Sequence, residues 1–437
     1  MNIEPRRGLA LFALALALGL VATGCGTPHV DRIRIGVIAE CRSGGPLSDE
    51  YELTLAGAEL PFVDRGAKLK GRTPSNGIRG ASISGKPVDL LIACSAFGSW
   101  RSMLEQLRSL VEQQKANAVV LPFVANAGLV VKDYARRHPG VIFIPISTEQ
   151  TPTLKQPLAN VFRFEPDGAQ LVAGLGSYAY RTLGWRRVVT VGEYDPFGFS
   201  QVGGFVAEFC SLGGIVVQRL WTDGGLLDYA PVVRRIRMKG VDGVFFPGGV
   251  GGGSRSLAGA LARRFPNLSR SLLVGGIPLI TGPPPGNLVG VVGGSEFPFA
   301  PPPSTWTRYV SDLKRTFGMQ SNWIEVPFYV ATDALLEALG QVRGDVSHGE
   351  HRLRAALGRL RLDTPMGVRT LDRRHQAITP IYLSRIEKDA TGKVIIRRIR
   401  VVSNVEQTFN GYFGATSPVP SETQPTCRHG NPPAWAR

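Results

Sequence analysis

The stretch RIRIGVIAE, residues 32–40, opens the part of the chain whose pattern decides the fold. It is a short apolar run rich in isoleucine, which is typical of a buried strand. The segment 53–63 then predicts a helix, VDLLIAC at 88–94 predicts a second strand, and residues 100–113 carry apolar side chains at the spacing of one helical face. Strand, helix and strand in this order predict right-handed crossovers and a parallel sheet covered on both faces.

Two similar series of this kind follow one another along the chain. The first continues with predicted strands at 117–122 and 141–145 and a helix at 129–137. The second begins after Arg163, with predicted helices at 171–183, 202–212, 229–239 and 257–264 and strands at 186–192, 214–220, 242–249 and 271–276. A proline-rich segment at 294–305, helices at 306–317 and 327–342, and β-rich pieces at 368–372, 379–386 and 393–402 come after them. The simplest architecture is an α/β fold of two similar halves.

The N-terminus has the layout of a secretory signal. Arg6 and Arg7 precede a run of about fourteen mostly apolar residues, and small residues then lead to Cys25 in LVATGCGTPH, residues 20–29. This run is short for a helix that must cross ~30 Å of hydrocarbon, so cleavage is favoured over a permanent membrane helix.

The residues before Cys25 also resemble the lipobox of bacterial lipoproteins, although Ala22 stands where leucine is commonest. This resemblance implies a signal peptide at 1–24, acylation of Cys25 and a tether at 25–31. The protein would then be extracytoplasmic and lipid-anchored to the bacterial cell membrane. Simple secretion and an uncleaved anchor are the alternatives.

Composition limits the possible partners. The net charge is +16, but the arginines are spread over predicted helices and strand ends and are not interleaved with aromatic residues, so we expect no nucleic-acid partner. A basic surface on an exported protein suits anionic lipid headgroups or cell-wall polymers, or is simply a solvated surface. The four cysteines after Cys25 are an even number, suited to two disulfide bonds in an oxidising compartment.

No catalytic or metal-binding pattern emerges from the sequence. SDLK at 311–314 matches one element of serine acyl-enzymes without its partner motifs, and HGEH at 348–351 offers two histidines without a third ligand. The cysteines form no CxxC spacing. We therefore expect no enzymatic activity, no cofactor and no metal.

Five local sequences, in the right order, resemble the type 1 periplasmic-binding fold of the branched-chain amino acid (Leu/Ile/Val)-binding family of ABC-transporter substrate-binding proteins. They are IGVIAECRSGG followed by LAGAEL, VVLPFVANAG, VIFIPISTEQTP, VVTVGEYDPFGFS and TPMGVRTLDRRHQAITPIYL. The resemblance covers nearly all of residues 32–410.

The resemblance implies two Rossmann-like lobes with parallel sheets flanked by helices, three hinge crossings and a ligand cleft between the lobes. Lobe 1 would comprise 32–164 and 297–365, lobe 2 would comprise 165–296 and 366–412, and a Pro-rich tail would follow at 413–437. It also implies a monomer that captures an amino acid-like molecule, amide or organic acid and delivers it to the transmembrane subunits of an ABC permease. A ligand receptor for a sensor or cell-envelope partner, and an interaction lipoprotein with an empty cleft, are the alternatives.

Five positions in lobe 1 correspond to ligand-binding positions of the family or lie beside them. The family's serine after the third strand falls on Ala125, with Asn126 beside it, and the turn after the fourth strand keeps Ser147 and Thr148, whose hydroxyl and amide groups can hold a polar or anionic group. Tyr51 lies in the first ligand loop or early in its helix. Ser147 and Thr148 can instead simply cap the next segment.

In lobe 2 the aromatic residues Tyr194, Phe197 and Phe246 fall at or near family ligand positions, although Phe197 and Phe246 suit an ordinary core equally well. The carboxylate that binds the α-ammonium in amino acid carriers should fall at 276–278, where the sequence has no acid, which argues against an α-amino acid ligand. The glycine run 248–253 before Ser254 suits a flexible turn better than an anion cradle.

The resemblance also implies how the cysteines pair. Cys41 and Cys94 end the first two strands of lobe 1, which are neighbours in the implied topology, so we expect a bond between them. Cys210 and Cys427 are left as the second pair, which would tie the tail to a lobe 2 helix.

Overall fold

The computed structural model describes residues 32–42, 50–96, 98–122, 127–155, 157–223, 228–237, 239–248, 253–264, 267–276, 286–347 and 350–437. The predicted signal peptide, Cys25 and the tether therefore lie outside the described residues, as do Ala125, Asn126 and most of the glycine run. Within the described residues, no helix is both long enough and apolar enough to cross a membrane.

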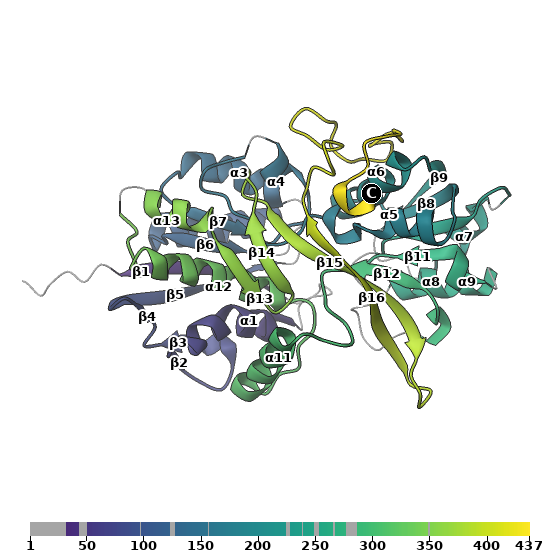
Figure 1. Ribbon diagram of the computed structural model, residues 1–437. Coiled ribbons are helices and arrows are strands. Elements are labelled where there is room, and N and C mark those ends of the chain that lie inside the picture. Colours follow the sequence, from purple (N-terminus) through teal and green to yellow (C-terminus); the bar gives the residue numbers. More distant parts are fainter. Residues whose placement is uncertain are drawn as a thin grey trace, which may run out of the picture. The chain divides into compact units, whose positions relative to one another are not determined.

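The first sheet has five strands in the order β4-β5-β1-β6-β7 (Figure 1). Their bounds are β1 Ile33–Arg42, β4 Ser82–Ile83, β5 Lys86–Ala96, β6 Ala118–Leu121 and β7 Ile142–Pro145. β1 is parallel to β5 and β6, and β6 is parallel to β7, whereas β4 adds an antiparallel edge. The four predicted strands of this half are confirmed, because buried parallel strands are continuous apolar runs.

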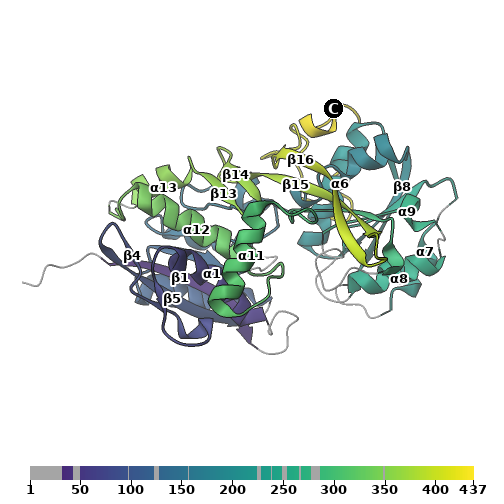
Figure 2. The same ribbon diagram turned by 60° about the horizontal axis from the view of Figure 1, so that its bottom comes forward.

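Helices cover both faces of this sheet (Figures 1 and 2). They are α1 Tyr51–Asp64, α2 Trp100–Arg108, α3 Ala127–Arg137, α11 Ser304–Phe317, α12 Val326–Gln341 and α13 His351–Leu357; the short β2 Lys68–Leu69 and β3 Ile78–Arg79 form a separate hairpin. Ile35 and Val37 of β1 pack in one core with side chains of α1 and α12. Ile38, on the opposite face of β1, packs in a second core with Met103 of α2 and Tyr134 of α3.

The second sheet has nine strands, ordered β13-β14-β15-β12-β11-β10-β8-β9 with β16 beside β15. The bounds are β8 Arg187–Glu193, β9 Ile215–Thr222, β10 Gly243–Phe246, β11 Leu272–Val274, β12 Val292–Ser295, β13 Arg361–Thr364, β14 Gly367–Leu371, β15 Ala377–Lys388 and β16 Val394–Val405. Strands β8 to β12 pair in parallel, whereas β13 to β16 pair antiparallel. The predicted parallel sheet is present as β8 to β12, and the C-terminal strands β13 to β16 extend it with an antiparallel part.

The helices of the second half are α5 Leu175–Ser177, α6 Pro196–Ser211, α7 Ala230–Arg235, α8 Gly253–Arg264 and α9 Leu268–Ser271, whereas the short α4 Thr151–Leu154 precedes the first crossing and lies beside α3 (Figure 1). The continuous helix predicted at 171–183 is wrong. Gly174 has φ 89°, in the left-handed region, and divides this segment into short helical pieces. The helix predicted at 229–239 is also shorter, since α7 ends at Arg235.

The chain passes between the two sheets three times: after β7, after β12 and between α13 and β14. β13 illustrates the last crossing, because it pairs with β14 while its residue Leu362 packs in the core of the five-stranded sheet. These crossings bring residues 163–165, 295–297 and 366–376 together, since Arg163 bonds to Gln376 and Arg369 bonds to Glu165 and Glu296.

The C-terminal tail is a packed part of the structure. Cys210 of α6 forms a disulfide bond with Cys427 at a Cα–Cα distance of 5.3 Å, and Trp435 Nε1 donates a hydrogen bond of 3.3 Å to Glu208 Oε2. Ala436, next to the chain end, is 1% exposed. The other disulfide bond joins Cys41 to Cys94 on neighbouring strands, with Cα atoms 5.5 Å apart.

Candidate functional site

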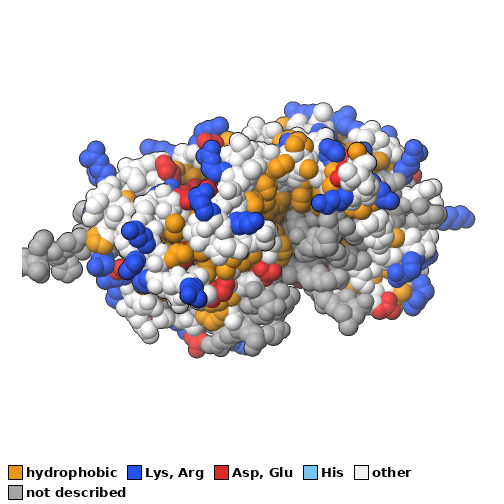
Figure 3. Space-filling model, turned by 90° about the horizontal axis from the view of Figure 1, so that it is seen from below, with side chains coloured by type: hydrophobic (Ala, Val, Ile, Leu, Met, Phe, Trp, Pro, Cys, Tyr) orange, Lys and Arg blue, Asp and Glu red, His pale blue; other side chains and the backbone are white. Residues whose placement is uncertain are grey.

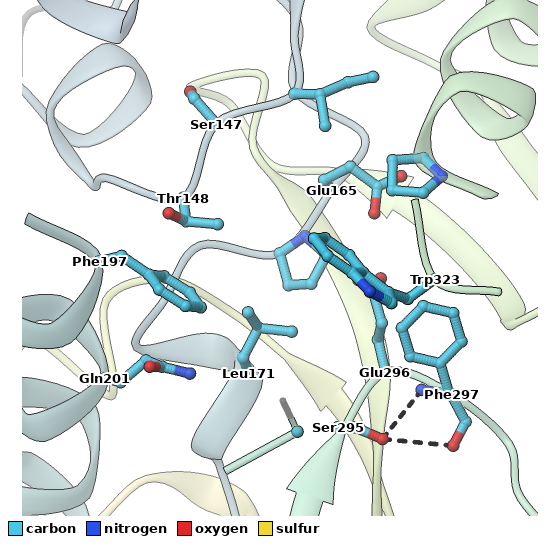
Figure 4. Close-up of a pocket in the computed structure, with 14 residues that line it drawn as sticks. Ser147, Thr148, Glu165, Leu171, Phe197, Gln201, Ser295, Glu296, Phe297 and Trp323 are labelled. Atoms are coloured by element: carbon cyan, nitrogen blue, oxygen red, sulfur yellow. Dashed lines mark hydrogen bonds between the residues drawn. The ribbon is translucent and has the colours of Figure 1, made fainter. Parts of the chain in front are cut away.

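A pocket lies where strand ends of both sheets and the crossing segments meet (Figure 4). Its empty volume, counted together with space open to solvent, is about 560 Å³. Its described lining residues are Ile146, Ser147, Thr148, Glu165, Pro166, Leu171, Phe197, Gln201, Gly276, Ser295, Glu296, Phe297, Trp323 and Pro327.

The turn after β7 forms one wall, and buried Arg163 fixes its shape. Arg163 Nη1 donates hydrogen bonds to the carbonyl oxygens of Ser147, at 3.0 Å, and of Glu149, while Nη2 donates to Thr153 Oγ1 at 2.8 Å. The Thr148 carbonyl accepts a further bond of 2.7 Å from the Gly168 amide. The backbone on both sides of Thr148 is therefore held in one conformation, with Thr148 facing the pocket.

The opposite wall comes from the start of α6. Asp195 caps this helix by accepting a hydrogen bond of 2.6 Å from the Gly198 amide, and Pro196 occupies a first-turn position. This start places Phe197 and Gln201, one turn apart, on the pocket side. Gln201 is 1% exposed, and its Oε1 accepts no hydrogen bond among the described residues.

Two carboxyl groups and one guanidinium form the charged part of the site. Arg369 Nη1 lies 2.6 Å from Glu165 Oε1, and Arg369 Nη2 lies 2.6 Å from Glu296 Oε2. Arg369 Nη1 also donates to the Phe164 carbonyl at 2.6 Å. The three side chains are buried and come from three different crossing segments, so one arginine joins all three crossings.

Burial sets the protonation of this group. It raises the pKa of Glu296 well above its usual range, and the negative charge of Glu165 adds to the effect while Arg369 opposes it. Burial alone would lower the pKa of Arg369, but the two carboxylates outweigh burial and raise it, so the guanidinium stays charged.

The structure brings three of the eight proposed ligand residues into this pocket: Ser147, Thr148 and Phe197. Tyr51 instead packs against the core of the five-stranded sheet, and Phe246 is 1% exposed in the core of the nine-stranded sheet. Tyr194 is 54% exposed and its hydroxyl donates to Glu422 of the tail. Ala125 and Asn126 lie outside the described residues.

The sequence reasoning missed Glu165, Glu296 and Trp323. The two acids had a local signal, since each is a lone carboxylate in an apolar, proline-containing segment, FRFEP and SEFPF. Trp323 lies in the connection between helices α11 and α12, where the sequence has no hydrophobic periodicity that would identify it as a site residue. The sequence has no acid at 276–278, where the family's ammonium-binding carboxylate is expected, but the crossings place two other carboxyl groups at the pocket.

The sequence predicts that the basic side chains are spread over the surface. On the face drawn in Figure 3, lysine and arginine side chains are distributed without a single dominant cluster. Within the described part of the chain, no group of three or more histidine, cysteine, aspartate or glutamate side chains is arranged to hold a metal ion.

Several solved structures share this fold. An ABC transporter substrate-binding protein from Sphaerobacter thermophilus matches with a TM-score of 0.75 and 22% identity over 86% of this chain and 99% of its own. A solute binding protein of an ABC transporter from Rhodopseudomonas palustris BisB5, in complex with 3,4-dihydroxy benzoic acid, gives 0.70 and 19% over 86% and 98%. A leucine binding protein from Thermotoga maritima MSB8 gives 0.66 and 17% over 85% and 99%.

A search of curated protein sequences finds no match. The model of the family described as periplasmic binding protein, however, matches residues 32–392, which include the first sheet, the second sheet except β16, the three crossings and the pocket. The chain therefore belongs to the periplasmic binding protein family.

Proposed function

We propose that this protein captures a small solute in the pocket and delivers it to the transmembrane subunits of an ABC permease. The observation that carries the proposal is the composition of the pocket wall. Ser147 and Thr148 follow a strand of one sheet, Phe197 and Gln201 follow a strand of the other, and Glu296 comes from a crossing. Ligands of open α/β sheets bind beyond such strand ends.

Capture at this place also supplies a signal of occupancy. A solute that contacts both sheets and the crossings favours the arrangement in which all these contacts form, by as much as its differential affinity for that arrangement. A permease that recognises this arrangement then distinguishes loaded from empty protein. The role is binding without catalysis, and it suits a monomer.

A thermal-shift screen of the purified chain tests the proposal. Amino acids, amines, organic acids, amides and sugars are each added at millimolar concentration, because a ligand that binds the folded state raises Tm by mass action. We expect at least one class to raise Tm and Thr148→Ala to reduce that shift, while Thr307→Ala on the exposed face of α11 leaves it unchanged. A flat screen with well-folded protein contradicts the proposal.

The pattern at 20–29 supports an export signal followed by a lipid anchor on Cys25, which would keep the pocket beside a membrane-embedded permease. The two disulfide bonds are consistent with an oxidising compartment outside the cytoplasm. Cell fractionation tests this: Cys25→Ser should move the protein from the membrane fraction to the soluble fraction, and retention in the membrane contradicts the anchor.

A further inference from the structure

The ionisable groups that line the described part of the pocket are carboxyl groups. Glu165 and Glu296 are the only ionisable side chains among its described lining residues. An anionic solute therefore has no cationic side chain to bind on the described walls.

The two arginines nearest the pocket are already engaged by the protein. Arg369 bonds to Glu165, Glu296 and the Phe164 carbonyl, and Arg163 bonds to backbone carbonyls and Thr153. Both guanidinium groups are 0% exposed, and neither lines the pocket. A solute carboxylate would have to break these bonds before it gained a partner, which is costly for buried charges.

An internal carboxylate also occupies the start of α3. Glu149 Oε1 accepts a hydrogen bond from the Gly128 amide, in the first turn of that helix. The contact is so close that a Cβ on residue 128 would lie 2.0 Å from Glu149 Oε1. Helix N-termini attract anions, so the protein's own side chain occupies a position that would otherwise favour an anionic ligand.

The uncharged walls favour a solute with an apolar body. Trp323, Phe297 and Phe197 supply aromatic rings, and Figure 4 shows Trp323 and Phe297 on the same side of the pocket as the two glutamates. Aromatic faces attract cations as well as apolar groups, and a neighbouring carboxylate adds to that attraction. Apolar surface, aromatic rings and carboxylates together are suited to an apolar amine.

We infer that the pocket selects a small apolar or aromatic amine over a carboxylate of the same size, with the ammonium group bound by Glu165, whose Oε2 has no hydrogen-bond partner among the described residues, and by Glu296. This inference rests on the proposed function, since it names the solute class of the same pocket. It departs from the organic acid that the sequence resemblance allowed, because the described walls offer a carboxylate the hydroxyl groups of Ser147 and Thr148 but no cationic side chain.

The protonation of Glu296 gives the inference a second readout. The charged groups that face Glu296 are Glu165 and Arg369; burial and the charge of Glu165 raise the pKa of Glu296, and Arg369 opposes the rise. An ammonium group at this place favours the ionised form of Glu296 and lowers its pKa. Binding of an amine should therefore release protons from the protein.

Isothermal titration calorimetry with three probes of one size tests the inference: benzylamine, benzyl alcohol and benzoate, each titrated into the purified chain at pH 7. We expect benzylamine to bind at least about tenfold more tightly than benzoate. In buffers of different ionisation enthalpy, the measured enthalpy should report the released protons. Glu296→Gln should weaken benzylamine at least about tenfold, abolish the proton release and leave benzyl alcohol within about twofold.

Glu59→Gln, the same substitution at a buried carboxyl group outside the pocket lining, is the matched control and should change none of these values. Benzoate binding as tightly as benzylamine, or benzylamine binding unchanged in Glu296→Gln, overturns the inference and leaves the proposed function intact. If none of the three probes binds, the charge of the ligand found in the wide screen decides: a cation supports the inference and an anion overturns it. If no compound in the thermal-shift screen raises Tm, that result contradicts both the proposed function and this inference.

Discussion

Glu59 of α1 shows what a buried carboxyl group costs when it has no partner. The residue is 0% exposed, and neither of its carboxyl oxygens has a hydrogen-bond partner among the described residues. Burial raises the pKa of Glu59 to about 8, and the charge of Glu52 contributes to the rise while Lys70 opposes it. Glu165 and Glu296 differ from it because a guanidinium binds both of them.

This pKa makes stability depend on pH in a defined direction. In the unfolded chain a glutamate ionises near ~4.3, whereas folded Glu59 keeps its proton up to about 8. Its contribution to stability is therefore fully present below about pH 4 and is lost as pH rises towards 8. Glutamine does not titrate, so Glu59→Gln removes this loss.

We expect the change in unfolding free energy caused by Glu59→Gln to be more favourable at pH 7 than at pH 4 by at least about 1 kcal/mol. Urea denaturation at the two pH values measures it, and comparing the two differences cancels any packing effect of the amide. Glu105→Gln on the exposed face of α2 is the control. An equal effect at both pH values would mean that folded Glu59 ionises normally.

Helix α6 packs so closely that two of its glycines have structural roles. A Cβ on Gly204 would lie 2.4 Å from the Ala169 carbonyl oxygen, and one on Gly198 would lie 2.3 Å from that of Glu193. The backbone of α6 thus touches the segment that follows the first crossing, and the same helix carries Phe197 and Gln201 into the pocket. A shift of α6 moves one wall of the site.

Gly204→Ala should therefore destabilise the fold by about 1–3 kcal/mol, because the new methyl group meets backbone that cannot retract. Gly340→Ala in α12 is the matched control, since no atom lies within 4 Å of a Cβ there, and alanine should stabilise this helix by about 0.5–1 kcal/mol. Denaturant unfolding measures both variants. If both substitutions lowered the free energy of unfolding, or both raised it, the packing argument would be contradicted.

The elements of the α/β core could be predicted because buried parallel strands are continuous apolar runs. β12, with the sequence VGGS, has no such run, and only its pairing with β11 and β15 makes it a strand. The residues that line the pocket likewise fall into a group that could be predicted from the sequence and a group that could not. Thr148 and Phe197 follow predicted strands at the sheet edges, whereas Glu165, Glu296 and Trp323 lie in segments whose positions depend on contacts far along the chain.

The two disulfide bonds constrain the whole molecule unequally. Cys41 and Cys94 are 53 residues apart in the sequence, whereas Cys210 and Cys427 are 217 apart. A longer closed loop removes more entropy from the unfolded chain, about 5 kcal/mol for the longer loop against about 4 for the shorter in the chain-entropy model. The second bond also holds the tail on α6.

Cys427→Ser paired with Cys210→Ser should lower the free energy of unfolding by about 2–5 kcal/mol, and by more than the pair Cys41→Ser with Cys94→Ser. Guanidinium denaturation of the two double variants under oxidising conditions measures the difference. Removing both partners avoids a free thiol. A larger loss from the Cys41 and Cys94 pair would show that native packing, and not loop length, dominates.

The packed tail has a consequence for the order in which the protein matures. Phe409 and Phe413 belong to the same core as Leu175, Phe205 and Phe209, and Trp435 packs against it. A chain that emerges N-terminus first, from a ribosome or a translocation channel, therefore holds an unfinished second half until residues 409–435 are released. The buried core of the first half contains no described residue after Met366, so this half can fold earlier. A truncation that removes residues 409–435 should therefore destabilise the early elements of the second half, such as α5 and α6, as much as β15 and β16.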